Sequence, residues 1–290
     1  MIAFPTSFRN DINMSALHPA PHTSRHVEAN GVKLHYLDYG TEGRPPMICL
    51  HGGAVTAHWF DFVAGGFTAD FHVRALDQRG HGDSAWADPP DYGFERYASD
   101  LNEVAERLDL RDFVLVGHSM GGTVGLTYAA TYPGRVKSLV VIDSTLQASP
   151  ERIASLHRVG NREGSNYATR EEFIERFKVR PEGTQAVPEI IRYLAERGAR
   201  QGADGRWRHK FDRNVYSKRV LMDIPPLWDR VKIPVLLVKG GLSDRITPEI
   251  YEDIRARAPQ VEMAEVPRSE HHVTLDNPQG FVRAVQAFLA

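Results

Sequence analysis

A serine flanked by glycines joins a strand-like segment to a helix-like segment. Residues 116–122 read VGHSMGG, which matches the pattern G-x-S-x-G. The mostly apolar run at residues 112–116 is typical of a buried strand, and the run from Met120 to Pro133 suits a helix. This order predicts a sharp strand-to-helix turn with Ser119 at its tip, where the serine oxygen can attack a carbonyl-type carbon.

The glycines around Ser119 have a steric reason. Gly117 and Gly121 leave room for the strand and the helix to approach closely, which a side chain would block. The helix N-terminus that follows favours negative charge beside the serine. The pattern alone is a weak signal, because a loop serine among glycines also satisfies it.

Strand-like and helix-like runs alternate along most of the chain. The pair Asn30-Gly31 predicts a hairpin turn between the first two strands. The strand-like runs are residues 26–29, 32–39, 47–50, 72–76, 112–116, 138–142, 234–238 and 261–266, and the clearest helix-like runs are 94–108, 120–132 and 281–289. This order predicts an α/β fold with a mostly parallel sheet that helices cover on both faces.

The strand pattern stops between residues 146 and 226, where arginine and glutamate are frequent. The helices predicted there are residues 151–159, 170–177 and 186–196. We therefore divide the chain into a sheet domain, residues 26–145 and 229–290, and a helical insertion within it, residues 146–228. Residues 1–25 have no continuous apolar run and are interpreted as a loose N-terminal extension.

The composition limits the partners of the chain. Its 290 residues are 42% hydrophobic and 25% charged with a formal charge of -2, so a nucleic-acid partner is not expected. No apolar stretch approaches the roughly 20 residues that span a bilayer. The single cysteine, Cys49, lies in an apolar run and is interpreted as a buried structural residue. Without an internal disulfide, the default expectation is a cytoplasmic protein.

Four further motifs carry a family resemblance. They are HGGA at residues 51–54, DQRGHGDS at 77–84, GLSDRITP at 241–248 and HHVTLDNP at 271–278. With the serine turn, they make the chain resemble the α/β-hydrolase superfamily, specifically its cap-bearing esterase and epoxide-hydrolase-like branch. The resemblance implies an eight-stranded, mainly parallel sheet, a helical cap formed by the insertion, and no cofactor. It also implies a catalytic triad in the chain order serine, acid, histidine.

The chain meets that order with Ser119, Asp244 and His271. A serine hydroxyl needs a base to take its proton, an imidazole can take it near neutral pH, and a carboxylate orients the ring. Asp244 has a glycine three residues before it and a proline four residues after it, as the family pattern requires. His271 stands seven residues before Pro278, as the family histidine does.

The sequence offers a second candidate for the catalytic histidine and for the catalytic acid. His272 is adjacent to His271 and could be the base instead, but the spacing to Pro278 favours His271. Asp143 follows the strand-like run at residues 138–142, at a position that some relatives use for the acid. Its alternative role is a turn or strand-end residue, and the fuller motif favours Asp244.

Two backbone N–H groups are expected to stabilise the substrate oxyanion. Met120 N–H follows the nucleophile directly, and the resemblance implies Gly53 N–H as the second donor. The thirteen histidines raise the question of a metal site. No paired acidic ligand set occurs at metal-ligand spacing, so no metal is expected.

The serine at the turn narrows the reaction. Epoxide hydrolases and haloalkane dehalogenases of this fold use aspartate there, so the resemblance implies a cofactor-independent hydrolase of a small carboxylic ester or lactone, acting through an acyl-enzyme. The alternatives are a carbon–carbon bond or amide hydrolase of the same fold, and a ligand-sensing protein with slow turnover. The sequence leaves the oligomeric state open, including a homo-oligomer.

The insertion is expected to decide the substrate. Its first half carries six arginines: Arg152, Arg158, Arg162, Arg170, Arg176 and Arg180. Because glutamates are interleaved with them, a solvated helix surface is the favoured interpretation. The alternative is that one or two of the arginines face the cleft and bind a substrate carboxylate.

Overall fold

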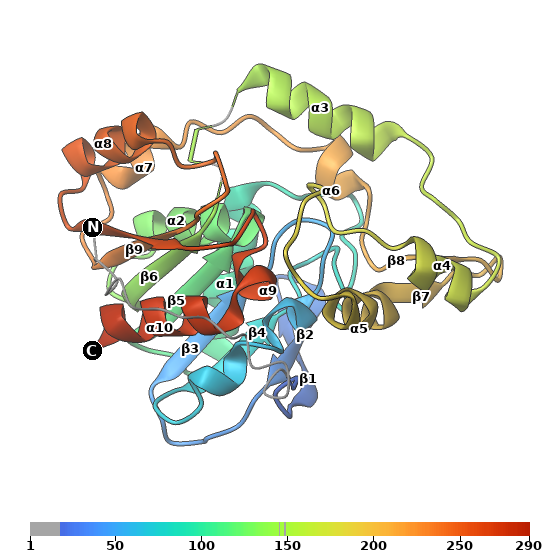
Figure 1. Ribbon diagram of the computed structural model, residues 1–290, viewed down its shortest axis with the longest axis horizontal. Coiled ribbons are helices and arrows are strands. Elements are labelled where there is room, and N and C mark those ends of the chain that lie inside the picture. Colours follow the sequence, from blue (N-terminus) through green and yellow to red (C-terminus); the bar gives the residue numbers. More distant parts are fainter. Residues whose placement is uncertain (1–17, 145, 148) are drawn as a thin grey trace.

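The computed structural model describes residues 18–144, 146–147 and 149–290. Its centre is an eight-stranded sheet in the order β1-β2-β4-β3-β5-β6-β9-β10 (Figure 1). The strands are β1 Thr23–Ala29, β2 Val32–Asp38, β3 Pro46–Leu50, β4 His72–Leu76, β5 Phe113–His118, β6 Val136–Ile142, β9 Val235–Gly240 and β10 Val261–Val266. The six strands from β4 to β10 pair in parallel, and β2 pairs antiparallel with both β1 and β4. The predicted mostly parallel sheet is confirmed.

The sheet begins slightly earlier than the sequence suggests. Asn30 and Gly31 form the predicted turn between β1 and β2 with φ angles of 47° and 75°. Strand β1 starts at Thr23, so the last three residues of the expected loose extension pair with β2. Most of that expected extension, residues 1–17, lies outside the described residues.

Successive side chains along the strands pack alternately into two hydrophobic cores, one on each face of the sheet. Ile48 and Leu50 of β3 pack into one core, and Met47 and Cys49 into the other. Cys49 is buried, as predicted. Helices α1 Phe94–Arg107 and α2 Met120–Thr131 supply apolar side chains to the first core. The second core takes its partners from the short 3-10 helix η2 Ala57–Phe60 and from α10 Pro278–Leu289.

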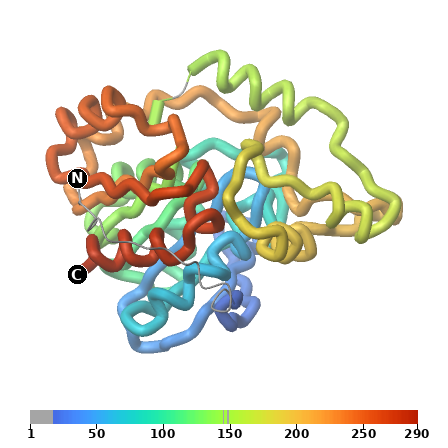
Figure 2. Tube along the Cα trace, viewed as in Figure 1, coloured from blue at the N-terminus to red at the C-terminus, as the bar shows by residue number. Residues whose placement is uncertain are grey.

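The chain between β6 and β9 leaves the sheet and runs along one side of it (Figure 2). The helices of this connection are α3 Pro150–Asn161, α4 Arg170–Arg176, α5 Pro188–Gly198, α6 Asn214–Ser217 and α7 Pro225–Trp228. The three longest match the predicted helices to within about two residues. The sequence did not predict the hairpin of β7 Ala199–Gln201 and β8 Trp207–His209, because three-residue strands are too short to show an alternating pattern. The boundaries of the insertion as a separate cap stay a prediction.

Helices α3 and α6 approach so closely that a glycine is needed between them. A Cβ added to Gly160 would lie 2.2 Å from the backbone nitrogen of Ser217, which no side chain can tolerate. The two remaining helices near the sheet edge are α8 Pro248–Arg257 and α9 Val273–Asp276. In the part of the chain that the structure describes, no helix combines the length and apolarity that crossing a membrane would need.

Candidate active site

The predicted turn at the serine is present. Strand β5 ends at His118, helix α2 begins at Met120, and Ser119 between them has φ 52° and ψ -114°. This left-handed φ is unfavourable for a residue with a Cβ, so the surrounding packing must hold it. The backbone N–H of Ser119 donates to the carbonyl oxygen of Ile142 on β6, 2.9 Å away. The turn therefore presents the hydroxyl at the carboxyl edge of the sheet, where α/β proteins form their sites.

The glycines beside Ser119 are required by close backbone contacts. A Cβ on Gly117 would lie 2.3 Å from the carbonyl oxygen of Gly121, and a Cβ on Gly121 would lie 2.2 Å from that of Leu50. Neither contact can relax by moving a flexible side chain, because both involve backbone atoms. Close approach of strand and helix thus explains the G-x-S-x-G pattern in steric terms.

Three side chains form a continuous hydrogen-bonded chain at this edge. Nε2 of His271 lies 3.1 Å from Oγ of Ser119, and Nδ1 of the same ring lies 2.8 Å from Oδ2 of Asp143. A carboxylate oxygen only accepts, so Nδ1 carries the proton and Nε2 is free to accept the serine proton. His271 is 5% exposed, and Asp143 is completely buried.

The prediction that Asp244 is the partner of the histidine is wrong in this structure. Asp244 is exposed at the surface, and the carboxylate against His271 belongs to Asp143. The neighbours of Asp244 explain the difference. Oγ of Ser243 donates to Oδ2 of Asp143 at 2.8 Å, and Nε of Arg245 lies 3.6 Å from the same oxygen. Because Ser243 and Arg245 both turn inward, the residue between them turns out to solvent.

Asp143 is held in place by the strand ends around it. It follows β6 directly, and its own backbone N–H donates to Val238 on β9 at 2.8 Å. The backbone N–H of Gly240 lies 3.3 Å from its Oδ1. Burial raises the pKa of Asp143, while the hydrogen bonds from Ser243 and Gly240 and the charge of Arg245 oppose that rise. The carboxyl group is thus fixed toward the His271 ring.

The basicity of His271 is reduced by its surroundings. Burial is the main cause of its lowered pKa, followed by the positive charge of Arg245, then by His272 and Arg152. The His118 ring also lies close to it, with ring centroids 4.8 Å apart. The electrostatic field at His271 therefore disfavours the imidazolium form.

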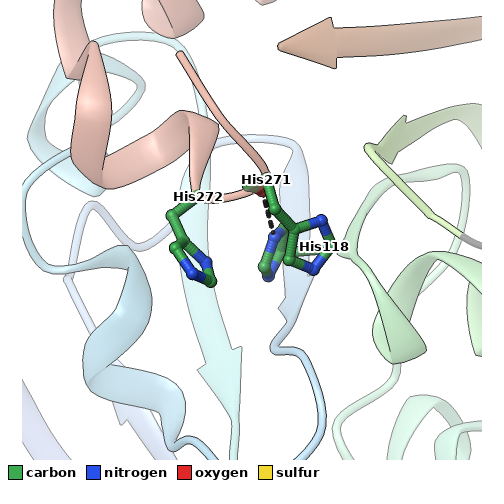
Figure 3. A group of neighbouring side chains, drawn as sticks. All are labelled: His118, His271 and His272. Carbon is green, nitrogen blue, oxygen red and sulfur yellow. Dashed lines mark hydrogen bonds between the residues drawn. The ribbon is translucent and has the colours of Figure 1, made fainter. Parts of the chain in front are cut away.

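Two further histidines, His118 and His272, lie beside His271 and make other contacts (Figure 3). Nε2 of His118 donates to the backbone oxygen of His271 at 2.9 Å, and its ring stacks on Trp59. Nε2 of His272 donates to the carbonyl oxygen of Pro181 at 2.9 Å. Of the two adjacent histidines, His271 is thus the one that contacts Ser119.

Folding brings possible metal ligands together that lie far apart in the sequence. His118, His271 and His272 have nitrogen atoms within 4.8 Å of one another. Both ring nitrogens of His271 are already engaged by Ser119 and Asp143. A metal here would compete with the serine contact, so this cluster does not indicate a resident metal.

The glycine loop predicted to face the serine lies beside it. A Cβ on Gly52 would lie 3.3 Å from Cβ of Ser119, and a Cβ on Gly53 would lie 2.6 Å from the Tyr216 hydroxyl. The backbone N–H of Gln78 donates to Nε2 of His51 at 3.1 Å, which holds the loop against the next strand end. The glycine loop thus lies against Ser119, and Met120 follows Ser119 as the first residue of α2. Tyr216 was not recognised from the sequence, because no motif surrounds it.

A pocket of about 550 Å³ opens onto His271. One wall comes from the region between β6 and β9, with Arg152 and Pro181 among its residues. Another part of the lining comes from the loop after β9, which includes Asp244 and Arg245. This volume suits a small molecule.

Known proteins resemble this chain over nearly its whole length. A model of the alpha/beta hydrolase family matches residues 47–284. The sn-1-specific diacylglycerol lipase of Mus musculus is 31% identical over 267 residues, which cover 85% of this chain and 81% of the lipase. The 2-(acetamidomethylene)succinate hydrolase of Mesorhizobium japonicum is 28% identical over 271 residues, which cover 92% of this chain and 95% of that enzyme.

Solved structures agree with these relatives. A crystal structure of E-2-(acetamidomethylene)succinate hydrolase has a TM-score of 0.81 at 25% identity, covering 93% of this chain and 99% of that one. The matched fold, the serine turn and the hydrolases among the relatives have one consistent explanation. The chain belongs to the alpha/beta hydrolase family and is a hydrolytic enzyme.

Proposed function

We propose that the chain is a serine hydrolase in which Ser119 is the nucleophile, His271 the general base and acid, and Asp143 the carboxylate that orients the histidine. The observation that carries this proposal is the hydrogen-bonded sequence from Ser119 through His271 to Asp143. It has the geometry in which an imidazole takes a serine proton while its other nitrogen is held by a carboxylate.

The reaction follows from these contacts. As Oγ of Ser119 attacks the substrate carbonyl carbon, its proton moves to Nε2 of His271, and the imidazolium is stabilised by Asp143. The backbone N–H groups of Met120 and Gly53 bind the oxyanion that forms. His271 then gives the proton to the leaving group, which leaves an acyl-enzyme on Ser119. Water, activated by the same histidine, releases the acid and regenerates the serine.

A carboxylic ester is the proposed substrate type, since an alcohol is an easily displaced leaving group. An amide is a second candidate. The relative with the TM-score of 0.81 is named for a substrate that combines an acetamido group with succinate.

A matched pair of substrates tests the bond type. We expect a phenyl ester of a short acid to be cleaved with a kcat/KM at least about tenfold above that of the corresponding anilide, because the anilide leaving group is harder to expel. A faster rate on the anilide would contradict ester specificity and favour the amidase candidate. A burst of one equivalent followed by retained product would instead favour a ligand-sensing protein.

The activity is expected to persist into mildly acidic solution. His271 must be neutral to accept the serine proton, so kcat/KM falls as the pH drops through the pKa of the His271–Asp143 pair. Because the pKa of His271 is lowered below its ordinary 6.5, the midpoint of this acidic limb should lie below pH 6.5. Rates on an ester without ionisable groups, measured from pH 4 to 8 at constant ionic strength, give the midpoint. A midpoint above 6.5 would contradict the assignment of the lowered pKa.

A further inference from the structure

We propose that Arg152 and Arg245 bind a carboxylate group of the substrate, so that the enzyme acts on acyl compounds that carry a free carboxylate near the scissile bond. This inference rests on the proposed function, because it uses Ser119 and His271 as the reacting groups. It names the substrate class that the pocket next to them selects.

The two arginines line the same pocket from different parts of the chain. Arg152 belongs to α3, and Arg245 to the loop that follows β9. Both line the pocket of about 550 Å³ into which His271 opens. A group held between them would therefore lie a short distance from the reacting atoms. Two guanidinium groups facing one cavity match the two oxygens of a carboxylate.

The pKa shifts of Arg152, Arg245 and His271 indicate that positive charge dominates the part of the pocket next to His271. The pKa of Arg152 is lowered, first by loss of water contact and then by the positive charge of Arg245. Burial also lowers the pKa of Arg245, which Asp143 and Asp244 partly offset. Among the charged neighbours that shift the pKa of His271, Arg245 has the largest effect, and Arg152 adds to it.

The acidic residues of the pocket do not cancel this charge at His271. Glu182 forms ion pairs with Arg180 and with Lys178, the latter at 3.9 Å. Asp244 lines the pocket but is exposed, and its charge raises the pKa of Arg245. Glu182 and Asp244 therefore act on basic residues other than Arg152. Glu270 also lines the pocket, but it is not among the main causes of the pKa shifts of His271 and Arg152.

Arg152 also differs from other arginines of its region. Arg176 lies 3.6 Å from Glu172, and Arg180 pairs with Glu182, as a solvated helix surface predicts. Within the described residues, no carboxylate lies within ion-pair distance of Arg152. Arg152 is exposed as well, but unlike Arg176 it lines the pocket, and among the residues that the structure describes it has no carboxylate partner.

A bound carboxylate would also assist the chemistry. The two arginines disfavour the imidazolium form of His271, which must form during the reaction. A substrate carboxylate between them would offset their charge and raise the pKa of His271 in the complex. The pocket then couples recognition of an anionic substrate to the basicity of the residue that activates Ser119.

The test compares monomethyl succinate with dimethyl succinate, which differ only in one distal methyl group. We expect the wild-type enzyme to have the higher kcat/KM on the monoester. Arg152→Gln should lower the monoester-to-diester ratio of kcat/KM by about 10- to 100-fold, the loss typical of a charged hydrogen bond. Arg158→Gln is the matched control, since Arg158 is exposed on the same helix and does not line the pocket. It should leave the ratio unchanged.

A second readout separates binding from a structural effect. Removing the charge of Arg152 should raise the midpoint of the acidic limb on dimethyl succinate, because one of the charges that lower the pKa of His271 is gone. Succinate itself should inhibit the wild-type enzyme competitively and inhibit Arg152→Gln at least about tenfold more weakly. Arg245 is not used as a variant, because it also contacts Asp143.

The outcomes distinguish the two proposals. If Arg152→Gln leaves both the ratio and succinate inhibition unchanged while Ser119 remains essential for cleaving the diester, the carboxylate inference is overturned and the serine hydrolase stands. If cleavage does not depend on Ser119, the proposed function fails. Should the wild-type cleave neither ester, calorimetric titration with succinate decides: binding that weakens in Arg152→Gln supports the carboxylate site, and no binding overturns it.

Discussion

Replacing Ser119 with alanine is expected to lower kcat on a short ester by at least about 10⁴-fold, because the variant has no oxygen that can attack the substrate. The hydroxyl is the group that Nε2 of His271 contacts at 3.1 Å, whereas the turn is bonded to the neighbouring strand β6 through the backbone N–H of Ser119. The fold should therefore survive the change. Steady-state rates and the melting temperature, measured on the same preparation, check both expectations. A fluorophosphonate should label the wild type and fail to label the variant.

Ser138→Ala provides a matched control. Ser138 is a buried serine on β6, and its hydroxyl has no hydrogen-bond partner among the described residues. Losing it removes an oxygen near the sheet centre without touching the His271 contact, so activity and labelling should remain. Undiminished turnover in Ser119→Ala would show that another group performs the chemistry, as in a lyase or oxygenase on this scaffold.

The sheet could be predicted because its signals are local. Strands β4 and β10 have the predicted bounds, since each is a short apolar or alternating run between turn residues. The hairpin turn followed from Asn30 and Gly31, which tolerate the left-handed φ that this turn requires. The hairpin of β7 and β8 gave no such signal, because three half-buried residues per strand leave nothing to alternate.

The site was predictable only in part, because a catalytic contact depends on distances between segments far apart in the chain. Ser119 carries its own steric signature, and it lies against His271 as the expected order requires. The choice of acid could not be made from a local motif, because two aspartates follow neighbouring parallel strands. Asp143 follows β6 and Asp244 follows β9, and both strand ends lie at the same edge of the sheet. Which carboxylate reaches the histidine depends on the direction of each side chain.

The substrate pocket depends on the same kind of distant contact. The sequence showed that Arg152 belongs to an arginine-rich segment, but it could not show that Arg245 lines the same pocket. Arg245 stands next to Asp244 in a motif that drew attention to the aspartate. In the folded chain the arginine turns toward the site and the aspartate turns away.

Two aspartate substitutions decide which acid acts. Asp143→Asn keeps the size of the side chain but replaces the carboxylate that accepts the Nδ1 proton of His271, so the ring loses the tautomer that the reaction needs. We expect kcat to fall by about 10⁴-fold, the loss typical of this change in serine hydrolases of the same design. Asp244→Asn should change kcat by about fivefold or less, since an exposed charge contributes about 1 kcal/mol at most.

The pair of variants is informative because each serves as the control for the other. Both replace an aspartate at the same edge of the sheet, and Asp244 also lines the pocket, so its loss reports any general effect of charge near the substrate. If Asp244→Asn caused the large loss and Asp143→Asn did not, the loop after β9 would have to rearrange in solution to bring Asp244 against His271. The hydrogen bond from Ser243 and the contact of Arg245 with Asp143 oppose that rearrangement, because both would break as the loop turned over. Which of the two variants loses more kcat therefore tests the site geometry directly, because the conformation of the loop after β9 decides which aspartate can reach His271.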